Sequence, residues 1–288
     1  MILVVGELLI DMITTELVNN LSETKYLQIK AGGSAANFAS FCSKLGASVR
    51  LISTVGMDGF GDIAIQAIRE SGIATNLINR LAGTCTSVII VSKSHSTPEF
   101  IPYRNADNNI EPVADEMITQ CDIIHTTAFA LSKRPAQTNI MEALEKAGKA
   151  NKLISIDWNY AEKIWAPGNC DNELYDKVIN YRPFLKVSMD DARRFWHIEN
   201  DVNAAKEVLN KYKTNFICLT NGAEGVYYKR TDEDWEYKPS LPTNVIDVTG
   251  AGDAFWSGFI TGYLQNESIE YAIDSALSVA KERLEQRI

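Results

Sequence analysis

The sequence is poor in the residues that build disulfide frameworks and metal clusters. Its 288 residues include 5 cysteines and 3 histidines. The cysteines, at positions 42, 85, 121, 170 and 218, are odd in number, widely spaced and without a Cys-x-x-Cys pair. This distribution argues against a disulfide framework or a thiolate zinc site, and it is typical of a protein from a reducing compartment.

Positive charge and long apolar runs are also lacking. The chain has 28 Lys and Arg against 37 Asp and Glu, which gives a formal net charge of −9. Because nucleic acids and anionic membranes attract excess positive charge, we expect neither as a partner. A small phosphate-bearing ligand needs only a local positive field and stays compatible with this charge. No run reaches the roughly 18 apolar residues of a membrane-spanning helix, and the N-terminus lacks the basic lead of a signal peptide, so we expect a cytoplasmic protein.

The sequence does contain a regular alternation of strand-like and helix-like segments, which predicts an α/β fold with a mostly parallel sheet. Strand-like runs lie at 2–5, 49–55, 123–125, 153–157, 184–188 and 216–220, and helical spacings at 35–45, 137–149, 203–212 and 269–284. Two more polar strand-like regions, about 12–31 and 84–106, interrupt this pattern, with a turn predicted at 95–98. We expect these two regions to form one small sheet attached to a core made of residues 1–11, 32–83 and 107–288.

The sharpest local pattern is DVTGAGD at 247–253. We expect a strand-like run at 244–248 to lead into it and a helix over 254–264 to follow. Gly250 and Gly252 permit backbone conformations closed to other residues, so successive N–H groups at the helix start can converge on an anion. Asp253 beside them could accept a proton from an attacking hydroxyl. An ordinary helix entry capped by aspartate fits the same residues about equally well.

A second glycine segment, AGGSAAN at 31–37, also precedes a helix. Gly32 and Gly33 would allow a ligand to contact the backbone closely. Asn37 offers both a donor and an acceptor, which suits the recognition of a hydroxyl. Asp11, after the first strand, could accept hydrogen bonds from two hydroxyls.

Other glycine patterns carry less information. TNGAEG at 220–225 lies between two strands and is typical of a hairpin turn. No Gly-x-x-x-x-Gly-Lys-Ser/Thr motif occurs, which excludes a P-loop enzyme. GFGDIA at 59–64 matches a dinucleotide-binding pattern, but a turn and a helix start explain it better.

Taken together and in this order, these segments resemble the ribokinase-like (PfkB) family of carbohydrate kinases over nearly the whole chain. The motifs are AGGSAANFASFCSKLG at 31–46, VGMDGFG at 55–61, TNGAEG at 220–225 and DVTGAGDAFWSGF at 247–259. The resemblance implies a three-layer α/β/α core that carries a small β-sheet lid, with a sugar bound between them. It also implies ATP-dependent phosphorylation of a sugar hydroxyl, with Mg²⁺ bridging the phosphates.

Roles for single residues follow from their places in these motifs. Asp253 looks like the catalytic base, and Gly250, Ala251 and Gly252 look like the anion hole. The residues that look like sugar contacts are Asp11, Gly32, Gly33, Asn37, Arg104 and Asn159. Those that look like nucleotide contacts are Ser188, Thr220, Gly222 and Gly225. Asp191 would hold Mg²⁺ through water, while Asp247 and Thr249 fall where family members often bind a monovalent cation, usually potassium.

Two segments bear on the identity of the sugar. PEFIPYRNAD at 98–107 is similar to the lid segment of fructokinases, and SIDWNYAEKIW at 155–165 to a stretch shared by fructokinases and 2-keto-3-deoxygluconate kinases. Ala161 stands where the sugar-acid kinases place an arginine against the substrate carboxylate. The missing charge partner favours a neutral sugar, with fructose as the best candidate. Phosphorylation of 2-keto-3-deoxygluconate, ribose or a nucleoside stays an alternative.

The resemblance has departures as well. Ser188 and Asp191 replace the Asn and Glu of the family's Asn-x-x-Glu stretch, which leaves a non-catalytic sugar-binding regulator as an alternative from another class. Relatives usually continue through a Gly-Ala-containing segment that completes the adenine and potassium pockets, and LEQRI at 284–288 offers no such residues. Lid edges in this family often pair between subunits, so we expect a homodimer.

Overall fold

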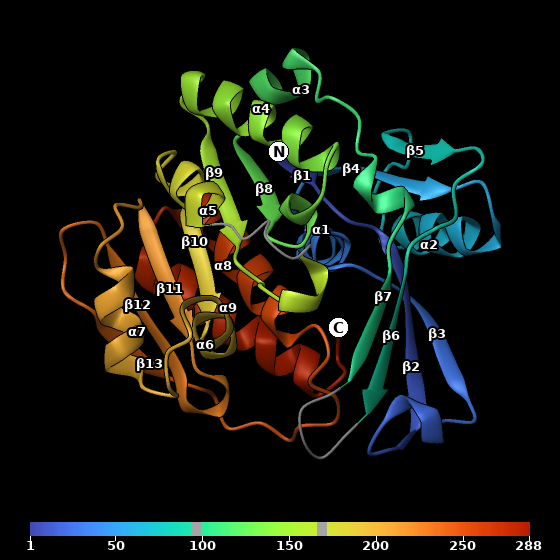
Figure 1. The fold of residues 1–288 in the computed structure, drawn as a ribbon. Helices are drawn as coiled ribbons and strands as arrows, with labels where there is room; N and C mark the ends of the chain where they lie inside the picture. The colour runs from blue at the N-terminus through green and yellow to red at the C-terminus, as the bar shows by residue number, and fades with distance from the viewer. Residues whose placement is uncertain (94–98, 166–171) are drawn as a thin grey trace.

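The computed structural model describes residues 1–93, 99–165 and 172–288, and these residues form two β-sheets (Figure 1). The larger sheet has the strand order β13-β12-β11-β10-β9-β8-β1-β4-β5. From β11 to β5 all neighbouring strands are parallel, whereas β12 and β13 are added antiparallel. Its strands are β1 (Ile2–Val5), β4 (Val49–Gly56), β5 (Ile78–Leu81), β8 (Ile123–Thr127), β9 (Leu153–Asp157), β10 (Phe184–Ser188), β11 (Phe216–Thr220), β12 (Gly225–Arg230) and β13 (Glu236–Pro239).

Helices cover both faces of this sheet because its central strands are apolar on both sides. In β1, Leu3 and Val5 belong to one hydrophobic cluster, while Ile2 and Val4 belong to the other. The first cluster is completed by α3 (Asp115–Gln120), α4 (Ala136–Lys149), α5 (Asn172–Ile179), α6 (Met189–Trp196) and α7 (Val202–Leu209). The second is completed by α1 (Ser34–Lys44), α2 (Gly59–Glu70), α8 (Ala251–Asn266) and α9 (Ile269–Leu284). This three-layer α/β/α arrangement confirms the predicted fold class.

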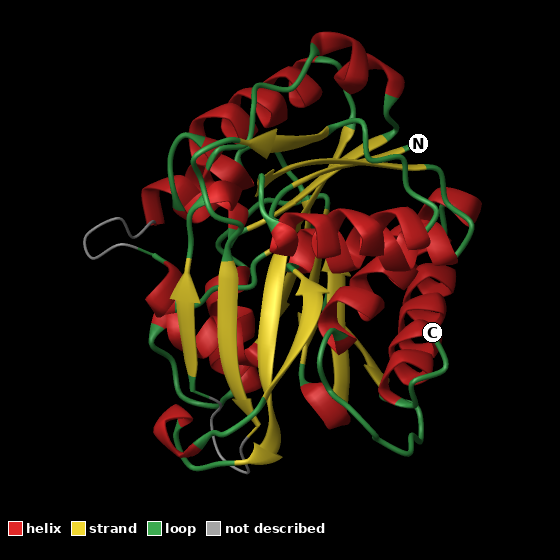
Figure 2. Cartoon of the chain, turned by 90° about the vertical axis from the view of Figure 1, so that its right-hand side faces the viewer, coloured by secondary structure: helices red, strands yellow, loops and turns green. Residues whose placement is uncertain are grey.

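The smaller sheet has the strand order β3-β2-β6-β7. Its strands are β2 (Leu9–Leu17), β3 (Leu27–Gly32), β6 (Val88–Lys93) and β7 (Phe100–Tyr103). β2 pairs in parallel with β6, and β3 and β7 pair antiparallel at the two edges. Figures 1 and 2 show these strands extending away from the core. One face turns toward the core, since Ile89 is only 7% exposed and belongs to the first hydrophobic cluster.

Most predicted elements are present, and the run at 244–248 is the clear correction. It contains no strand. Its backbone instead bonds to the end of a helix, because Ile246 N donates to Leu284 O at 2.9 Å. The turn predicted at 95–98 and Cys170 lie outside the described residues.

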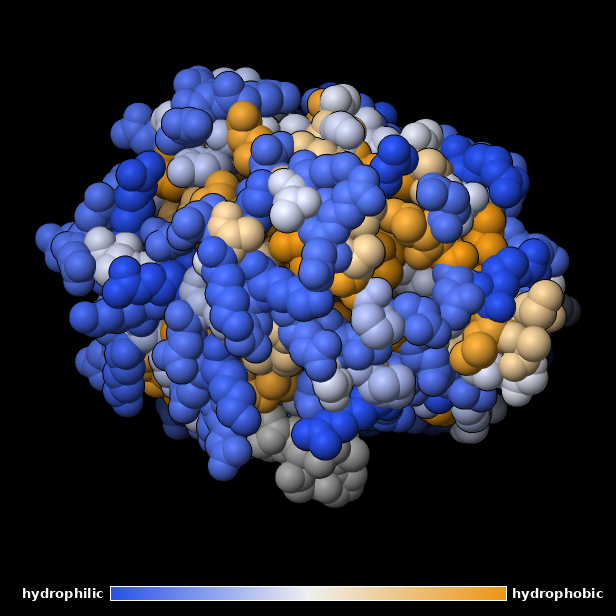
Figure 3. Space-filling view, turned by 90° about the horizontal axis from the view of Figure 1, so that it is seen from above, coloured by the Kyte–Doolittle hydropathy of each residue, from blue (hydrophilic) through white to orange (hydrophobic). Residues whose placement is uncertain are grey.

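The surface is consistent with this division between core and exterior. Figure 3 shows a face on which hydrophilic residues predominate and hydrophobic ones show through in patches. Among the helices that the structure describes, none has the length and apolar character needed to cross a membrane.

Candidate active site

A cleft of about 640 Å³ opens where β9, β10 and β11 end and α8 begins. Parallel strands present their carboxyl ends at one edge of a sheet, and such edges are common ligand sites in α/β proteins. The cleft gathers residues from widely separated motifs. Its lining includes Ser34, Asp157, Asn159, Lys186, Ser188, Asp191, Thr220, Asn221, Gly222, Gly250, Ala251, Gly252 and Asp253.

The first turn of α8 lies where the sequence predicts an anion-binding nest. Gly250 caps the helix in the left-handed conformation, with φ 74°, which favours glycine. The helix then begins at Ala251. Ala251 N donates to Val248 O at 3.2 Å and Ala254 N to Gly250 O at 2.9 Å, so the free N–H groups of this turn, among the described residues, are those of Gly252 and Asp253. Gly250, Ala251 and Gly252 all line the cleft. The structure therefore presents backbone dipoles to the cleft where an anion can be held.

Asp253 lies beside this nest and is held by two side chains from α1. Ser34 Oγ donates to Asp253 Oδ1 at 2.6 Å, and Asn37 Nδ2 donates to Asp253 Oδ2 at 2.9 Å. Burial and the neighbouring Asp157 raise the pKa of Asp253 to about 6, against the lowering effect of these donors and of Lys186. A carboxylate with such a pKa is ionised at neutral pH and is still basic enough to accept a proton.

A buried glutamate holds the start of α1 in place, and none of the sequence motifs indicated it as a site residue. Glu7 Oε1 accepts a hydrogen bond from Ala35 N at 3.2 Å, and Glu7 Oε2 accepts one from Thr127 Oγ1 at 2.8 Å. Gly33 precedes the helix with φ 101°, and a side chain there would collide with the Glu7 backbone. Glu7 thus positions the helix turn that carries Ser34 and Asn37.

Asp11 and Gly32 meet at the junction of the small sheet and α1. They lie on the paired strands β2 and β3, and a side chain at position 32 would overlap the Asp11 carboxylate. Burial raises the pKa of Asp11 to about 6, while Lys30, directly opposite on β3, lowers it. Gly32 is therefore required for the Asp11 carboxylate to occupy this position.

Lys186 is a site residue that the motifs did not reveal. Its Nζ lies 2.8 Å from both carboxylate oxygens of Asp157, which is its neighbour across the β9–β10 pair. A side-chain carbon at position 252 would lie 3.3 Å from the same Nζ, so the ammonium sits against the nest. Burial opposes its charge, but Asp157, Asp191 and Asp253 together raise the pKa of Lys186 above its usual value. The cleft thus contains a buried cation next to the backbone dipoles.

The other side of the cleft contains most of the expected nucleotide contacts. Ser188 and Thr220 are paired across β10 and β11, and Gly222 begins the short turn into β12. The segment at 220–225 is thus both a hairpin connection and part of the cleft wall. Asp191 accepts a hydrogen bond from Ser188 N at 2.9 Å and forms a capping box at the start of α6. Burial raises the pKa of Asp191 to about 6.

Eight expected site residues do not line this cleft, namely Asp11, Gly32, Gly33, Asn37, Arg104, Gly225, Asp247 and Thr249. Arg104 donates to Asp107 Oδ2 from Nε at 2.9 Å and contacts Ser132, and its side chain is 1% exposed. Gly225 has φ 126° and approaches Lys238 O closely, which gives it a structural reason to be glycine. Asp247 pairs with Arg283, and Thr249 N donates to Asp247 Oδ1 at 2.9 Å.

The residues present fit a phosphate-bound Mg²⁺ better than an independent metal centre. Among the described residues, no group of three or more His, Cys, Asp and Glu side chains is arranged to hold a metal ion. Mg²⁺ commonly keeps several waters and binds through one or two carboxylates plus substrate phosphates. Asp191, a carboxylate in the cleft wall, suits that role. The potassium site expected at Asp247 does not fit, because Arg283 already pairs with its carboxylate.

The arrangement combines three parts of a phosphoryl-transfer site. It has a carboxylate that can accept a proton, a nest of backbone N–H groups and a buried ammonium beside them. Phosphoryl transfer depends mainly on positioning and on stabilising the charge of the moving group. The same cleft therefore suits transfer of a phosphoryl group to a hydroxyl placed near Asp253.

Comparison with known proteins gives a consistent family assignment. Residues 1–287 match the model of the pfkB family carbohydrate kinases. The chain is 31% identical to an ATP-dependent 6-phosphofructokinase of Thermoanaerobacterium thermosaccharolyticum, over 98% of this chain and 87% of that protein. The fructokinase structure of Halothermothrix orenii has a TM-score of 0.88 at 31% identity, with 97% of each chain covered. A sugar kinase of Pyrococcus horikoshii in complex with ATP has a TM-score of 0.85 at 25% identity, covering 99% of this chain and 92% of the other.

Proposed function

Because the chain belongs to the pfkB family of carbohydrate kinases, we propose that it transfers the γ-phosphate of ATP to a hydroxyl of a small sugar. The observation that carries this proposal is Asp253, held by Ser34 and Asn37 beside the nest at the start of α8. A protein that only binds sugar has no need of a general base at this position. The kinase proposal is therefore favoured over a regulator.

In this proposal the sugar hydroxyl takes the place next to Asp253 that the Ser34 hydroxyl occupies in the structure. Asp253 accepts the hydroxyl proton as the sugar oxygen bonds to the γ-phosphorus and the bond to the ADP oxygen breaks. The nest at 250–252 and Lys186 stabilise the charge on the transferred group. Asp191 would hold Mg²⁺ through water, and the ion would supply further positive charge when bound with ATP.

The test is ADP release by purified protein with ATP, Mg²⁺ and a panel of sugars, for the native chain and for Asp253→Asn. The substitution keeps the size of the side chain and removes the base, so we expect turnover to fall by about 10²- to 10⁴-fold. Sugar binding measured by calorimetry should persist in the variant. Absence of turnover with every sugar, or unchanged turnover in Asp253→Asn, would refute the proposal.

Fructose is the first candidate substrate. Sugar-acid kinases have an arginine at the position of Ala161, where it pairs with the substrate carboxylate. The uncharged alanine of this chain offers no such partner, which favours a neutral sugar. The similarity to a fructokinase of known structure supports the same choice. In the panel, fructose should give a higher kcat/KM than ribose, 2-keto-3-deoxygluconate or a nucleoside.

Fructose 6-phosphate is a second candidate, favoured by Lys30. Its partner in the β2–β3 register is Asp11, so both side chains lie on one face of the small sheet. Lys30 is exposed and lowers the pKa of Asp11, which places its charge near the expected sugar contacts. An exposed ammonium there could pair with a sugar phosphate, and one of the relatives is a 6-phosphofructokinase.

Lys30→Ala separates the two substrates. If the natural substrate carries a phosphate, the variant should raise KM for fructose 6-phosphate about tenfold while leaving KM for fructose unchanged. Lys93→Ala on β6 of the same sheet is the matched control. Equal effects on both sugars would show that Lys30 does not recognise the phosphate.

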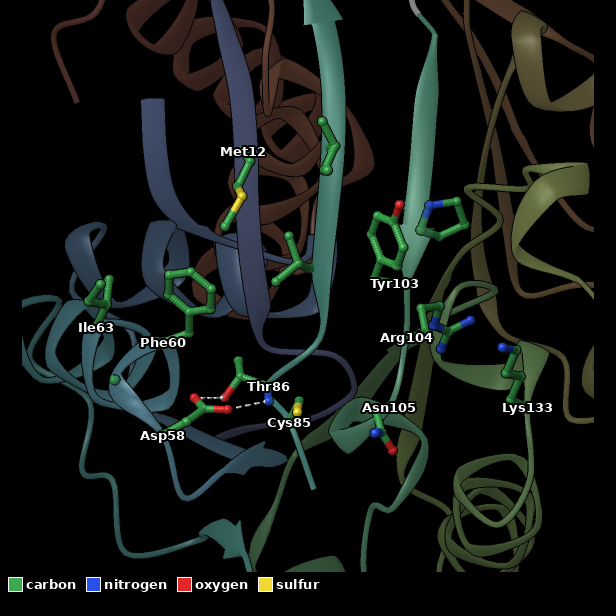
Figure 4. Close-up of a pocket in the computed structure, with 14 residues that line it drawn as sticks. Met12, Asp58, Phe60, Ile63, Cys85, Thr86, Tyr103, Arg104, Asn105 and Lys133 are labelled. Carbon is green, nitrogen blue, oxygen red and sulfur yellow. Dashed lines mark hydrogen bonds between the residues drawn. The ribbon is translucent and has the colours of Figure 1, made fainter. Parts of the chain in front are cut away.

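We also propose that the small sheet, made of β2, β3, β6 and β7, acts as a lid over the sugar and that its outer face joins two subunits. A hollow of about 1040 Å³ lies between this sheet and α2, with Met12, Phe60 and Tyr103 around it (Figure 4). Asp58 and Thr86 are hydrogen-bonded at one side of it.

Tyr103 is 60% exposed and Ile29 46% exposed, and such apolar exposure is typical of an interface. A homodimer through this face would cover these side chains.

A further inference from the structure

The loop that leads to the nest is fastened to the last turn of α9. Ile246 N donates to Leu284 O at 2.9 Å, and Asn244 N donates to Glu285 Oε1 at 3.3 Å. These bonds hold residues 244–247 against the helix end without any strand pairing. The position of the nest therefore depends on α9 as well as on α8.

Arg283 adds a charged contact to this attachment. Its Nη2 lies 3.0 Å from Asp247 Oδ2, and the other oxygen of the carboxylate accepts the hydrogen bond from Thr249 N. A side-chain carbon at position 250 would lie 3.7 Å from Arg283 Nε. The two paired side chains are only 15% and 25% exposed. The guanidinium thus spans the gap between Asp247 and the glycine that opens the nest.

The negative charge of the Asp247 carboxylate is held by two donors. Its Oδ1 accepts a hydrogen bond from Thr249 N at 2.9 Å, and its Oδ2 accepts one from Arg283 Nη2 at 3.0 Å. Left unpaired, this negative charge would lie close to the N–H groups that receive the phosphoryl group, and it would weaken their field. Some cation is therefore needed beside Asp247.

We propose that Arg283 is the resident cation of this loop and that the protein works without a monovalent metal ion. Arg283 acts as a positioning residue, since it neutralises Asp247 and holds the loop rather than touching the substrate. A potassium ion at Asp247 would have to displace the guanidinium from a charge-assisted hydrogen bond. This inference rests on the proposed kinase function.

The first test uses the native protein. ADP release with the best sugar is measured in potassium, sodium and choline chloride at equal ionic strength, with Mg²⁺ constant. We expect the same kcat in all three salts. Specific stimulation by potassium would overturn the proposal, whereas absence of turnover with any sugar would refute the kinase function instead.

The second test removes the guanidinium. Arg283→Ala should lower kcat about tenfold with little change in KM for the sugar, because the charge acts on the transferred group. Potassium or added guanidinium ion should restore part of the loss, and Arg283→Lys should retain activity in choline chloride. Arg230→Ala is the control, since Arg230 is an exposed arginine at the end of β12 and takes no part in the attachment of the loop. Unchanged kcat in Arg283→Ala without potassium would contradict the assignment.

A third measurement does not depend on turnover. Ions that bind the native state raise its melting temperature. Potassium should not raise the melting temperature of the native chain above that in choline chloride, but it should do so in Arg283→Ala. Specific stabilisation of the native chain by potassium would show that the ion binds despite Arg283.

Discussion

Asp253 illustrates how single side chains tune the candidate site. Burial and Asp157 raise its pKa to about 6, above the usual value of 3.8. A general base works only when deprotonated, so we expect kcat/KM to fall as the pH is lowered through about 6. A pH–rate profile with the best sugar checks this, with the coupling enzymes verified at each pH. A profile that stays flat through this region would exclude Asp253 as the titrating base.

Lys186 should affect both the rate and this pH profile. Lys186→Met removes the buried cation beside the nest, and we expect kcat to fall about 10²-fold. Because Lys186 lowers the pKa of Asp253, its removal should also move the acid limb of the profile to higher pH. A purely structural role for Lys186 would leave the position of that limb unchanged. Lys152→Met, which changes a half-buried lysine bonded to Thr119 O, is the control.

Single residues also show what the sequence could reveal. Asp253 and its glycines were recognisable because they are contiguous in one motif. Lys186 could have been flagged, since it interrupts the apolar strand FLKVS, where a lysine needs a buried partner. The pair of Arg283 with Asp247 was not predictable, because 36 residues separate them. Arg104 pairs with the buried Asp107 and lines the hollow beside the small sheet, so its expected contact with the sugar stays a prediction.

At the scale of elements, close packing of α8 on α9 positions the nest. A side-chain carbon on Gly258 would lie 2.9 Å from Ala276 Cα and 3.0 Å from Ser275 O. Gly258→Val must therefore push the two helices apart, and we expect it to destabilise the protein by about 1–3 kcal/mol and to lower kcat. Denaturant unfolding and ADP release measure the two effects.

Gly148→Ala in α4 is the matched control for this substitution. Its added carbon would meet only Tyr181 Cδ1, at an ordinary 3.6 Å. Alanine is also favoured over glycine within a helix, so stability should hold or rise slightly. If Gly258→Val were as stable as this control, close helix contact would not be what fixes the nest.

Elements were predictable where a local pattern decides them. Strands at 153–157, 184–188 and 216–220 and the helix at 269–284 have the bounds that the apolar spacing indicated. The run at 244–248 has a strand-like composition but lies against the end of α9, where its N–H groups bond to Leu284 O. Local composition does not specify such a partner. The edge strands β5 and β13 were missed because their sequences, INRL and EYKP, mix polar with apolar residues and lack the apolar run that marked β1.

At the scale of the whole molecule, the outer face of the small sheet should set the oligomeric state. We expect sedimentation to give a dimer for the native chain. Tyr103→Asp together with Ile29→Lys should give a monomer, because burying these charges without partners is unfavourable. Tyr237→Asp on β13, where the tyrosine is 49% exposed, is the control and should stay dimeric. A monomeric native chain at working concentration would exclude this interface.

The order of the strands in the small sheet has a consequence for folding. Its central pair joins β2, at Leu9–Leu17, to β6, at Val88–Lys93, and the chain between them builds α1, β4 and α2 of the core. Closing so long a loop is costly until the intervening elements are in place, so this sheet should form after the core and open before it. Segments that open first are where proteases cut first. A molecule caught with its core formed and its small sheet open would hold the nest and Asp253 but lack Asp11 in position, and so would be folded without yet being able to select a sugar.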